Sequence, residues 1–75
     1  MVGSVVETYR VDGVWRNRIG RNGAPLPGEC RTQEAAIEIG RGEARIRGVA
    51  HVIRRADGSV AERNRYARRS DELPS

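Results

Sequence analysis

The sequence predicts a small α+β fold of the order ββαββ, in which two antiparallel β-hairpins are separated by one α-helix that packs on an antiparallel sheet. Two segments rich in β-branched residues flank Asp12-Gly13, and a similar pair of segments flanks Asp57-Gly58. An Asp-Gly pair between two such segments is a strong hairpin signal. Between the hairpins, apolar residues recur at helical spacing. We expect residues 1–66 to form a single domain and residues 67–75 to form a disordered tail.

The first hairpin is expected to contain strands at residues 5–11 and 14–19, with Asp12-Gly13 between them. Two loop lengths are compatible with this sequence. A two-residue turn pairs Val11 with Val14, whereas a three-residue loop places Gly13 in the left-handed region and shifts the register. The three-residue loop is the preferred prediction, because it gathers the large apolar side chains on one face: Val5, Tyr9, Trp15 and Ile19.

Residues 20–31 contain three glycines and two prolines, which predicts a loop. Thr32 then begins a helix as its N-cap, because its hydroxyl can accept a hydrogen bond from a free amide of the first turn. Gly48 predicts the end of the helix, and a second pair of strands is expected at residues 49–55 and 60–66. One apolar stripe of this helix is expected to pack on the sheet: Ala36, Ile37, Gly40 and Ala44.

Trp15 is the largest side chain in the sequence, and we expect it to be the central aromatic residue of the core, in contact with Ile37. A second apolar stripe on the helix contains Ala35, Ile39 and Ile46. A domain of this size buries only about 60% of the surface that its unfolded chain exposes. The second stripe therefore predicts a homodimer interface, and its alternative cover is the loop at residues 25–27.

The composition argues against catalysis and against a bound cofactor. Cys30 and His51 are the single cysteine and the single histidine, so the sequence predicts no internal disulfide and no metal site. Neither a Cys30–His51 dyad nor the pair Glu34 and Glu38 is supported by a suitable pattern. No phosphate-binding glycine motif, signal peptide or membrane span is recognised. We expect a cytoplasmic protein that is not an enzyme and has no small-molecule substrate.

All fourteen cationic residues are arginines, and they are unevenly distributed. Residues 41–69 hold nine arginines against three acidic residues. Arginine suits phosphate because its guanidinium fork can bind two oxygens at once. Strand alternation predicts a basic ribbon on the last hairpin and the tail, although aromatic side chains do not alternate with the arginines and no known nucleic-acid motif occurs. The candidate polyanion-binding residues are Arg54, Arg55, Arg63, Arg65, Arg68 and Arg69.

Several of these features occur together in one known family. They are Asp12-Gly13 followed by Trp15, the helix start Thr32-Gln33-Glu34-Ala35-Ala36-Ile37, and a closing segment with Ile53, Asp57-Gly58, Val60, Glu62-Arg63 and Tyr66. The sequence resembles a family of small bacterial proteins known only as a domain of unknown function. The resemblance covers residues 9–66 and implies the ββαββ order, without implying an activity. Arg54 and Ala67 stand where the family commonly has histidine and glycine.

Two functions are compatible with these observations. The sequence favours a non-catalytic protein-interaction or self-association module, because the expected core is thin and the helix has a wide apolar arc. The alternative is nucleic-acid binding through the arginine-rich second hairpin and tail.

Overall fold

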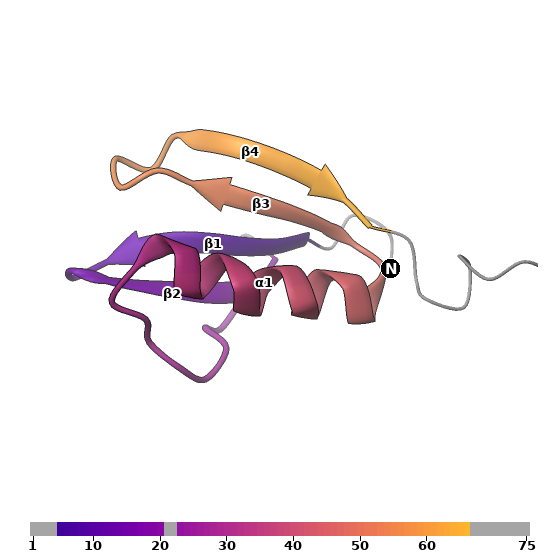
Figure 1. Ribbon diagram of the computed structural model, residues 1–75, viewed down its shortest axis with the longest axis horizontal. Helices are drawn as coiled ribbons and strands as arrows, with labels where there is room; N and C mark the ends of the chain where they lie inside the picture. The colour runs from indigo at the N-terminus through magenta and orange to yellow at the C-terminus, as the bar shows by residue number, and fades with distance from the viewer. Residues whose placement is uncertain (1–4, 21–22, 67–75) are drawn as a thin grey trace, which may run out of the picture.

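The computed structural model describes residues 5–20 and 23–66, which follow the predicted order ββαββ (Figure 1). The predicted tail at residues 67–75 lies outside the described residues. The elements are β1 (Val5–Val11), β2 (Val14–Ile19), α1 (Gln33–Arg47), β3 (Ala50–Arg54) and β4 (Val60–Arg65).

The strands form one mixed sheet in the order β2-β1-β3-β4. Each hairpin is antiparallel, as predicted, but β1 and β3 lie side by side in the centre and run parallel. The expectation of a purely antiparallel sheet is therefore wrong. The reason is the connection between the hairpins: α1 lies along the sheet and carries the chain back, so that β3 starts beside the start of β1, where Val5 pairs with Ala50 (Figure 1).

The first hairpin has the shorter of the two predicted loops, with Val11 paired to Val14. Asp12 and Gly13 both have positive φ, 52° and 82°. The two-residue turn that best fits the right-handed twist of paired strands requires positive φ at both positions. The preferred three-residue loop is thus wrong. In the observed register, Tyr9 lies opposite Arg16, on the sheet face that Trp15 does not share. Turn geometry, rather than the gathering of large apolar side chains, determines this register.

The predicted limits of α1 are confirmed. The Thr32 hydroxyl accepts a hydrogen bond from the Ala35 amide at 3.2 Å, and Gly48 ends the helix with a φ of 69°. The contacts of α1 fall mainly on β1, β2 and β3. Before the helix, the loop runs along the outer edge of β2: Trp15 and Cys30 exchange two backbone hydrogen bonds, and the Leu26 amide donates to the Asn17 carbonyl. The loop therefore pairs with one edge of the sheet.

The core between α1 and the sheet is built from small residues. Ala36, Gly40 and Ala44 are buried on the helix, as the first apolar stripe predicted. The largest fully buried side chains are His51, Val6 and Thr8. Trp15 is only half-buried, so the expectation that it forms the centre of the core is wrong. Because the helix presents alanine and glycine, its backbone lies close to the sheet and leaves no central space for an indole.

The second stripe of α1 faces away from the sheet. Ile39 is 45% exposed, Ile46 is 76% exposed, and Ala35 is also exposed. The loop at residues 25–27 pairs with β2 and does not cover these side chains. None of the described residues of the same chain covers this stripe.

Candidate functional site

The sheet has one face against α1 and one face turned away from it, which we call the open face. Thr8 and His51 lie on the helix side, where they meet Gly40. Because side chains alternate along a strand, Glu7 lies on the open face. Glu7 pairs with Arg18 of β2 and with Val52 of β3, and Val52 pairs with Arg63 of β4. These three residues therefore lie on the open face as well.

The open face is strongly basic. Its strands carry one acidic residue, Glu7, and the following arginines: Arg16 and Arg18 of β2, Arg54 of β3, and Arg63 and Arg65 of β4. A second acidic residue, Glu29 of the loop, lies at the edge of the face beside Arg16. The other described residues hold six arginines and six acidic residues. The positive charge of the described domain is thus concentrated on one side of the sheet, while the remaining surface is close to neutral.

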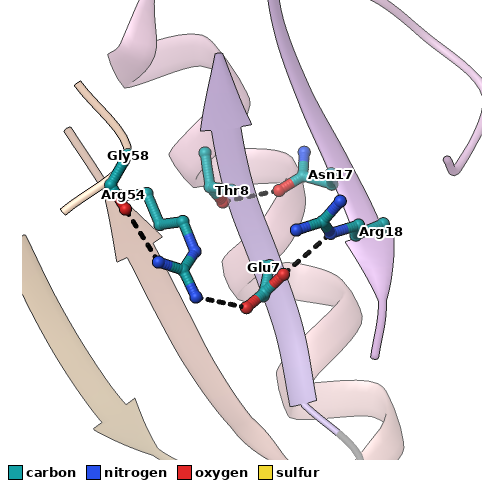
Figure 2. A network of polar contacts seen from close by, with 6 residues as sticks. All are labelled: Glu7, Thr8, Asn17, Arg18, Arg54 and Gly58. Carbon is teal, nitrogen blue, oxygen red and sulfur yellow. Dashed lines mark hydrogen bonds and ion pairs between the residues drawn. The ribbon is translucent and has the colours of Figure 1, made fainter. Parts of the chain in front are cut away.

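Glu7 of β1 lies at the centre of the open face, between Arg18 of β2 and Arg54 of β3 (Figure 2). Its carboxylate accepts hydrogen bonds from Arg18 Nε at 2.7 Å and from Arg54 Nη2 at 3.0 Å. Arg54 also donates to the Gly58 carbonyl at 2.8 Å. Glu7 is only 2% exposed although it is on the open face. Burial opposes its ionised form, but the hydrogen bonds and charges of Arg18 and Arg54 outweigh burial and lower the pKa of Glu7.

The arginines of β2 are held by further contacts at the edge of this face. The Arg18 guanidinium lies over the Tyr9 ring, 4.4 Å from its centroid. Arg16 forms an ion pair with Glu29 at 3.7 Å and donates to the Leu26 carbonyl at 3.3 Å. Arg63 and Arg65 of β4 are exposed. One outer strand therefore presents positioned, half-buried arginines, and the other presents exposed ones.

The candidate residues from the sequence are partly brought together. Arg54, Arg63 and Arg65 share the open face. Arg55 lies in the β3–β4 turn, where it donates to the Ser59 hydroxyl and the Val60 carbonyl. Arg68 and Arg69 lie outside the described residues. The candidate interface residues Ala35, Ile39 and Ile46 do lie together on the outer side of α1.

Arg16 and Arg18 were not among the candidates, although they complete the basic face. Strand alternation within residues 14–19 already places the two on one side. That this side is also the side of Arg63 and Arg65 depends on the pairing of β1 with β3. No local sequence signal specifies a pairing between strands so distant in the chain.

A buried polar cluster lies on the other face of the sheet, below α1. The Asn17 amide group donates to the Ala36 carbonyl at 3.0 Å, which leaves its oxygen to accept from the Thr8 hydroxyl at 2.5 Å. Because that hydroxyl has one proton, the 2.7 Å contact between Thr8 Oγ1 and His51 Nε2 must be donated by the imidazole. The cluster ties β1, β2, β3 and α1 together.

His51 in this cluster is fully buried, and its Nδ1 atom has no hydrogen-bond partner among the described residues. Burial lowers the pKa of His51, and the positive charge of Arg41 lowers it further, against a smaller opposing effect of Glu62. The imidazole is therefore neutral near pH 7. Cys30 is half-buried and pairs with Trp15 through its backbone. The His51 side chain therefore serves to pack the sheet against Gly40 of α1.

Among residues 5–20 and 23–66, no three side chains of His, Cys, Asp or Glu are grouped as metal ligands. Within the same residues, no helix has the length and apolar character needed to cross a bilayer.

No curated protein and no solved structure matches the chain. Residues 5–66 match the family described as "Uncharacterized protein conserved in bacteria (DUF2188)", and the match extends from the start of β1 to the residue after β4. It thus includes both hairpins, the helix and the whole described open face. The chain belongs to this family of uncharacterised bacterial proteins, DUF2188.

Proposed function

We propose that this chain is a non-catalytic nucleic-acid-binding module, and that its open face binds the phosphate backbone. The observation that carries the proposal is the separation of charge. Five arginines lie on the open face with Glu7 and, at its edge, Glu29, whereas the rest of the described domain has equal numbers of arginines and acidic residues. A face of one sign attracts a polyanion and orients it before contact.

The chemistry of the face supports backbone binding. Guanidinium groups bind phosphate oxygens through two parallel hydrogen bonds, and Arg63 and Arg65 are exposed and able to do so. Tyr9 has its ring covered by Arg18, so that side of the ring is not free to stack on a base. Contacts of this kind fix position without reading sequence. The proposed binding is therefore independent of sequence and sensitive to salt.

Fluorescence anisotropy with labelled DNA at about 150 mM salt tests the proposal. The double variant Arg63→Gln/Arg65→Gln is compared with a matched control, Arg10→Gln/Arg45→Gln. The control removes the same charge from exposed positions off the open face, on the helix side of β1 and on α1. We expect submicromolar binding by the natural chain, a loss of at least tenfold for the first variant, and a small change for the control. Equal losses for both variants, or no binding at this salt, would contradict the proposal.

A second candidate function is self-association, or binding of a protein partner, through the outer side of α1. The specific observation that favours it is the exposure of Ile39 and Ile46 on the same helix. Large exposed apolar side chains in one stripe are typical of interaction surfaces. This surface and the open face lie on opposite sides of the domain, so the two functions are compatible.

A further inference from the structure

We propose that the open face binds double-stranded DNA across its major groove, with β2 and β4 on the phosphates of opposite strands. This inference rests on the proposed nucleic-acid binding and names its ligand. It follows from the placement of the arginines on the outer strands and from the width of the sheet.

The arginines of the open face form two rows. Arg16 and Arg18 lie on β2, which is one outer strand of the sheet, and Arg63 and Arg65 lie on β4, which is the other. Three inter-strand spacings separate the rows, or about 14 Å. Each row has only two arginines, so the twist of the sheet changes the direction of a row more than the distance between the rows.

The strip between the rows is closed at its middle and nearly neutral. Glu7, Ala50 and Val52 of the central strands are 2%, 5% and 4% exposed. Arg54 is the one arginine of this strip, and it is held by Glu7 and by the Gly58 carbonyl. The face therefore offers positive charge at its two sides and little free hydrogen-bonding capacity at its centre.

The major groove of B-form DNA is about 12 Å wide and admits an α-helix or a two-stranded ribbon. A four-stranded sheet is too wide to enter it. When such a sheet lies across the groove, its outer strands come over the two phosphate backbones that border the groove. The arginine rows are then in place for phosphates of both DNA strands. Arg18 donates only its Nε–H to Glu7, so its Nη groups can reach a phosphate, whereas Arg16 must exchange its ion pair with Glu29 for one with phosphate. The closed central strip spans the groove without reading base edges.

Single-stranded DNA has one phosphate backbone and can contact only one arginine row at a time. An A-form RNA duplex has two backbones, but its major groove is narrow. The proposal therefore predicts a preference for duplex DNA. With four phosphates neutralised, the slope of log affinity against log salt is about −3.6 on duplex DNA. With one row filled, it is about −1.4 on a single strand.

The test measures anisotropy of labelled duplex DNA, duplex RNA and single-stranded DNA of equal length over a range of salt. We expect duplex DNA to bind at least tenfold more tightly than either competitor at about 150 mM salt. Arg16→Gln and Arg63→Gln, from opposite rows, are each expected to reduce the duplex slope by about 0.9. Glu29→Gln, which removes the carboxylate beside Arg16, is expected to strengthen duplex binding several-fold. Circular dichroism verifies that each variant is folded.

The outcomes separate this inference from the proposed function on which it rests. If single-stranded DNA or duplex RNA binds as tightly as duplex DNA, nucleic-acid binding stands and the two-row arrangement is wrong. The same holds if Arg63→Gln lowers the slope while Arg16→Gln leaves the slope unchanged and Glu29→Gln leaves the affinity unchanged. If none of the three nucleic acids binds at about 150 mM salt, the proposed function itself fails.

Discussion

Gly40 of α1 lies directly against His51 of β3: a Cβ atom added to Gly40 would come within 2.6 Å of His51 Nε2 and 2.7 Å of Thr8 Oγ1. The missing side chain is what allows the helix to lie on a polar cluster rather than on large apolar groups. Helix α1 contains a second glycine, Gly42, whose added Cβ would meet nothing within 4 Å. The two glycines therefore have different roles, although each lowers helix propensity equally.

Substitution of the two glycines separates these roles. Gly40→Ala is expected to reduce the free energy of unfolding by about 1 to 3 kcal/mol, because the added methyl group forces the cluster or the helix to move. Gly42→Ala is expected to increase it by up to about 1 kcal/mol, through helix propensity alone. Thermal unfolding followed by circular dichroism measures both, since about 1 kcal/mol shifts Tm by roughly 4 to 8 °C in a domain of this size. Two shifts of the same sign would contradict this account.

The buried imidazole makes stability depend on pH in a defined direction. The pKa of His51 is lowered by burial and by Arg41 from the ordinary value of 6.5. The unfolded chain therefore takes up a proton below about pH 6.5 while folded His51 does not, and stability decreases as the pH falls below this value. The decrease is at most about 1.4 kcal/mol per pH unit.

Urea denaturation at pH 7.5 and 5.5 tests this dependence, with His51→Gln as the control that removes it. Should that variant be too unstable, the titration of the imidazole in the natural chain gives the same information by NMR. A His51 pKa at or above 6.5 in the folded protein would contradict the buried, uncharged cluster.

Glu7→Gln tests the ion pairs on the open face. The variant loses a carboxylate that is bound by both Arg18 and Arg54, and we expect the free energy of unfolding to fall by about 2 to 3 kcal/mol. This loss of unfolding free energy is smaller than for a fully buried ion pair, because the side chains of both arginines are partly exposed to solvent. Glu43→Gln, which breaks the surface pair with Arg47 on α1, is the control and should cost about 0.5 kcal/mol. Chemical denaturation compares the two variants at pH 7.

The same ion pairs predict a second pH effect. Because Arg18 and Arg54 lower the pKa of Glu7 below 4.5, against the opposing effect of burial, the unfolded chain binds the proton first as the pH falls. The contribution of Glu7 is complete above pH 4.5 and is lost as the pH falls through the folded-state value. Glu7→Gln is therefore expected to differ least from the natural chain in strong acid. A constant difference between pH 7 and pH 3 would refute the assignment.

Self-association through α1 is tested by sedimentation equilibrium at micromolar to millimolar concentration. A homodimer that forms through the exposed stripe should dissociate in Ile39→Ser/Ile46→Ser, and this variant should keep its monomer fold because neither side chain is buried in the core. A dimer that persists in the variant, or a natural chain that remains at 8.3 kDa throughout, excludes this surface as the interface.

Much of the fold was predictable from local signals. The Asp-Gly pairs, the Thr32 cap and Gly48 each act within a few residues, and the elements begin and end close to where these residues predict. The preferred loop at Asp12-Gly13 is wrong because apolar clustering does not determine the register there, whereas the positive φ that both residues adopt does. The parallel pairing of β1 with β3 depends on how the helix returns the chain, which no local pattern encodes.

The candidate site was predictable only in part, for the same reason. Arg63 and Arg65 follow from alternation along one strand. Their position on one face with Arg16 and Arg18 follows from the sheet order. The polar centre of the core was missed because Thr8, Asn17 and His51 are far apart in sequence and have no apolar pattern. Gly40 was recognised as part of a small-residue stripe, but its neighbours become evident only in three dimensions.

The most direct test of the central claim, that the open face binds nucleic acid, is an NMR titration that follows the arginine Nε–H signals. Duplex DNA is added at about 150 mM salt to the full chain. We expect the signals of the two outer rows to shift together and saturably: Arg16, Arg18, Arg63 and Arg65. The signals of Arg41, Arg45 and Arg47 on α1 should remain in place. Shifts that are strongest on α1, or absent throughout, would contradict the account.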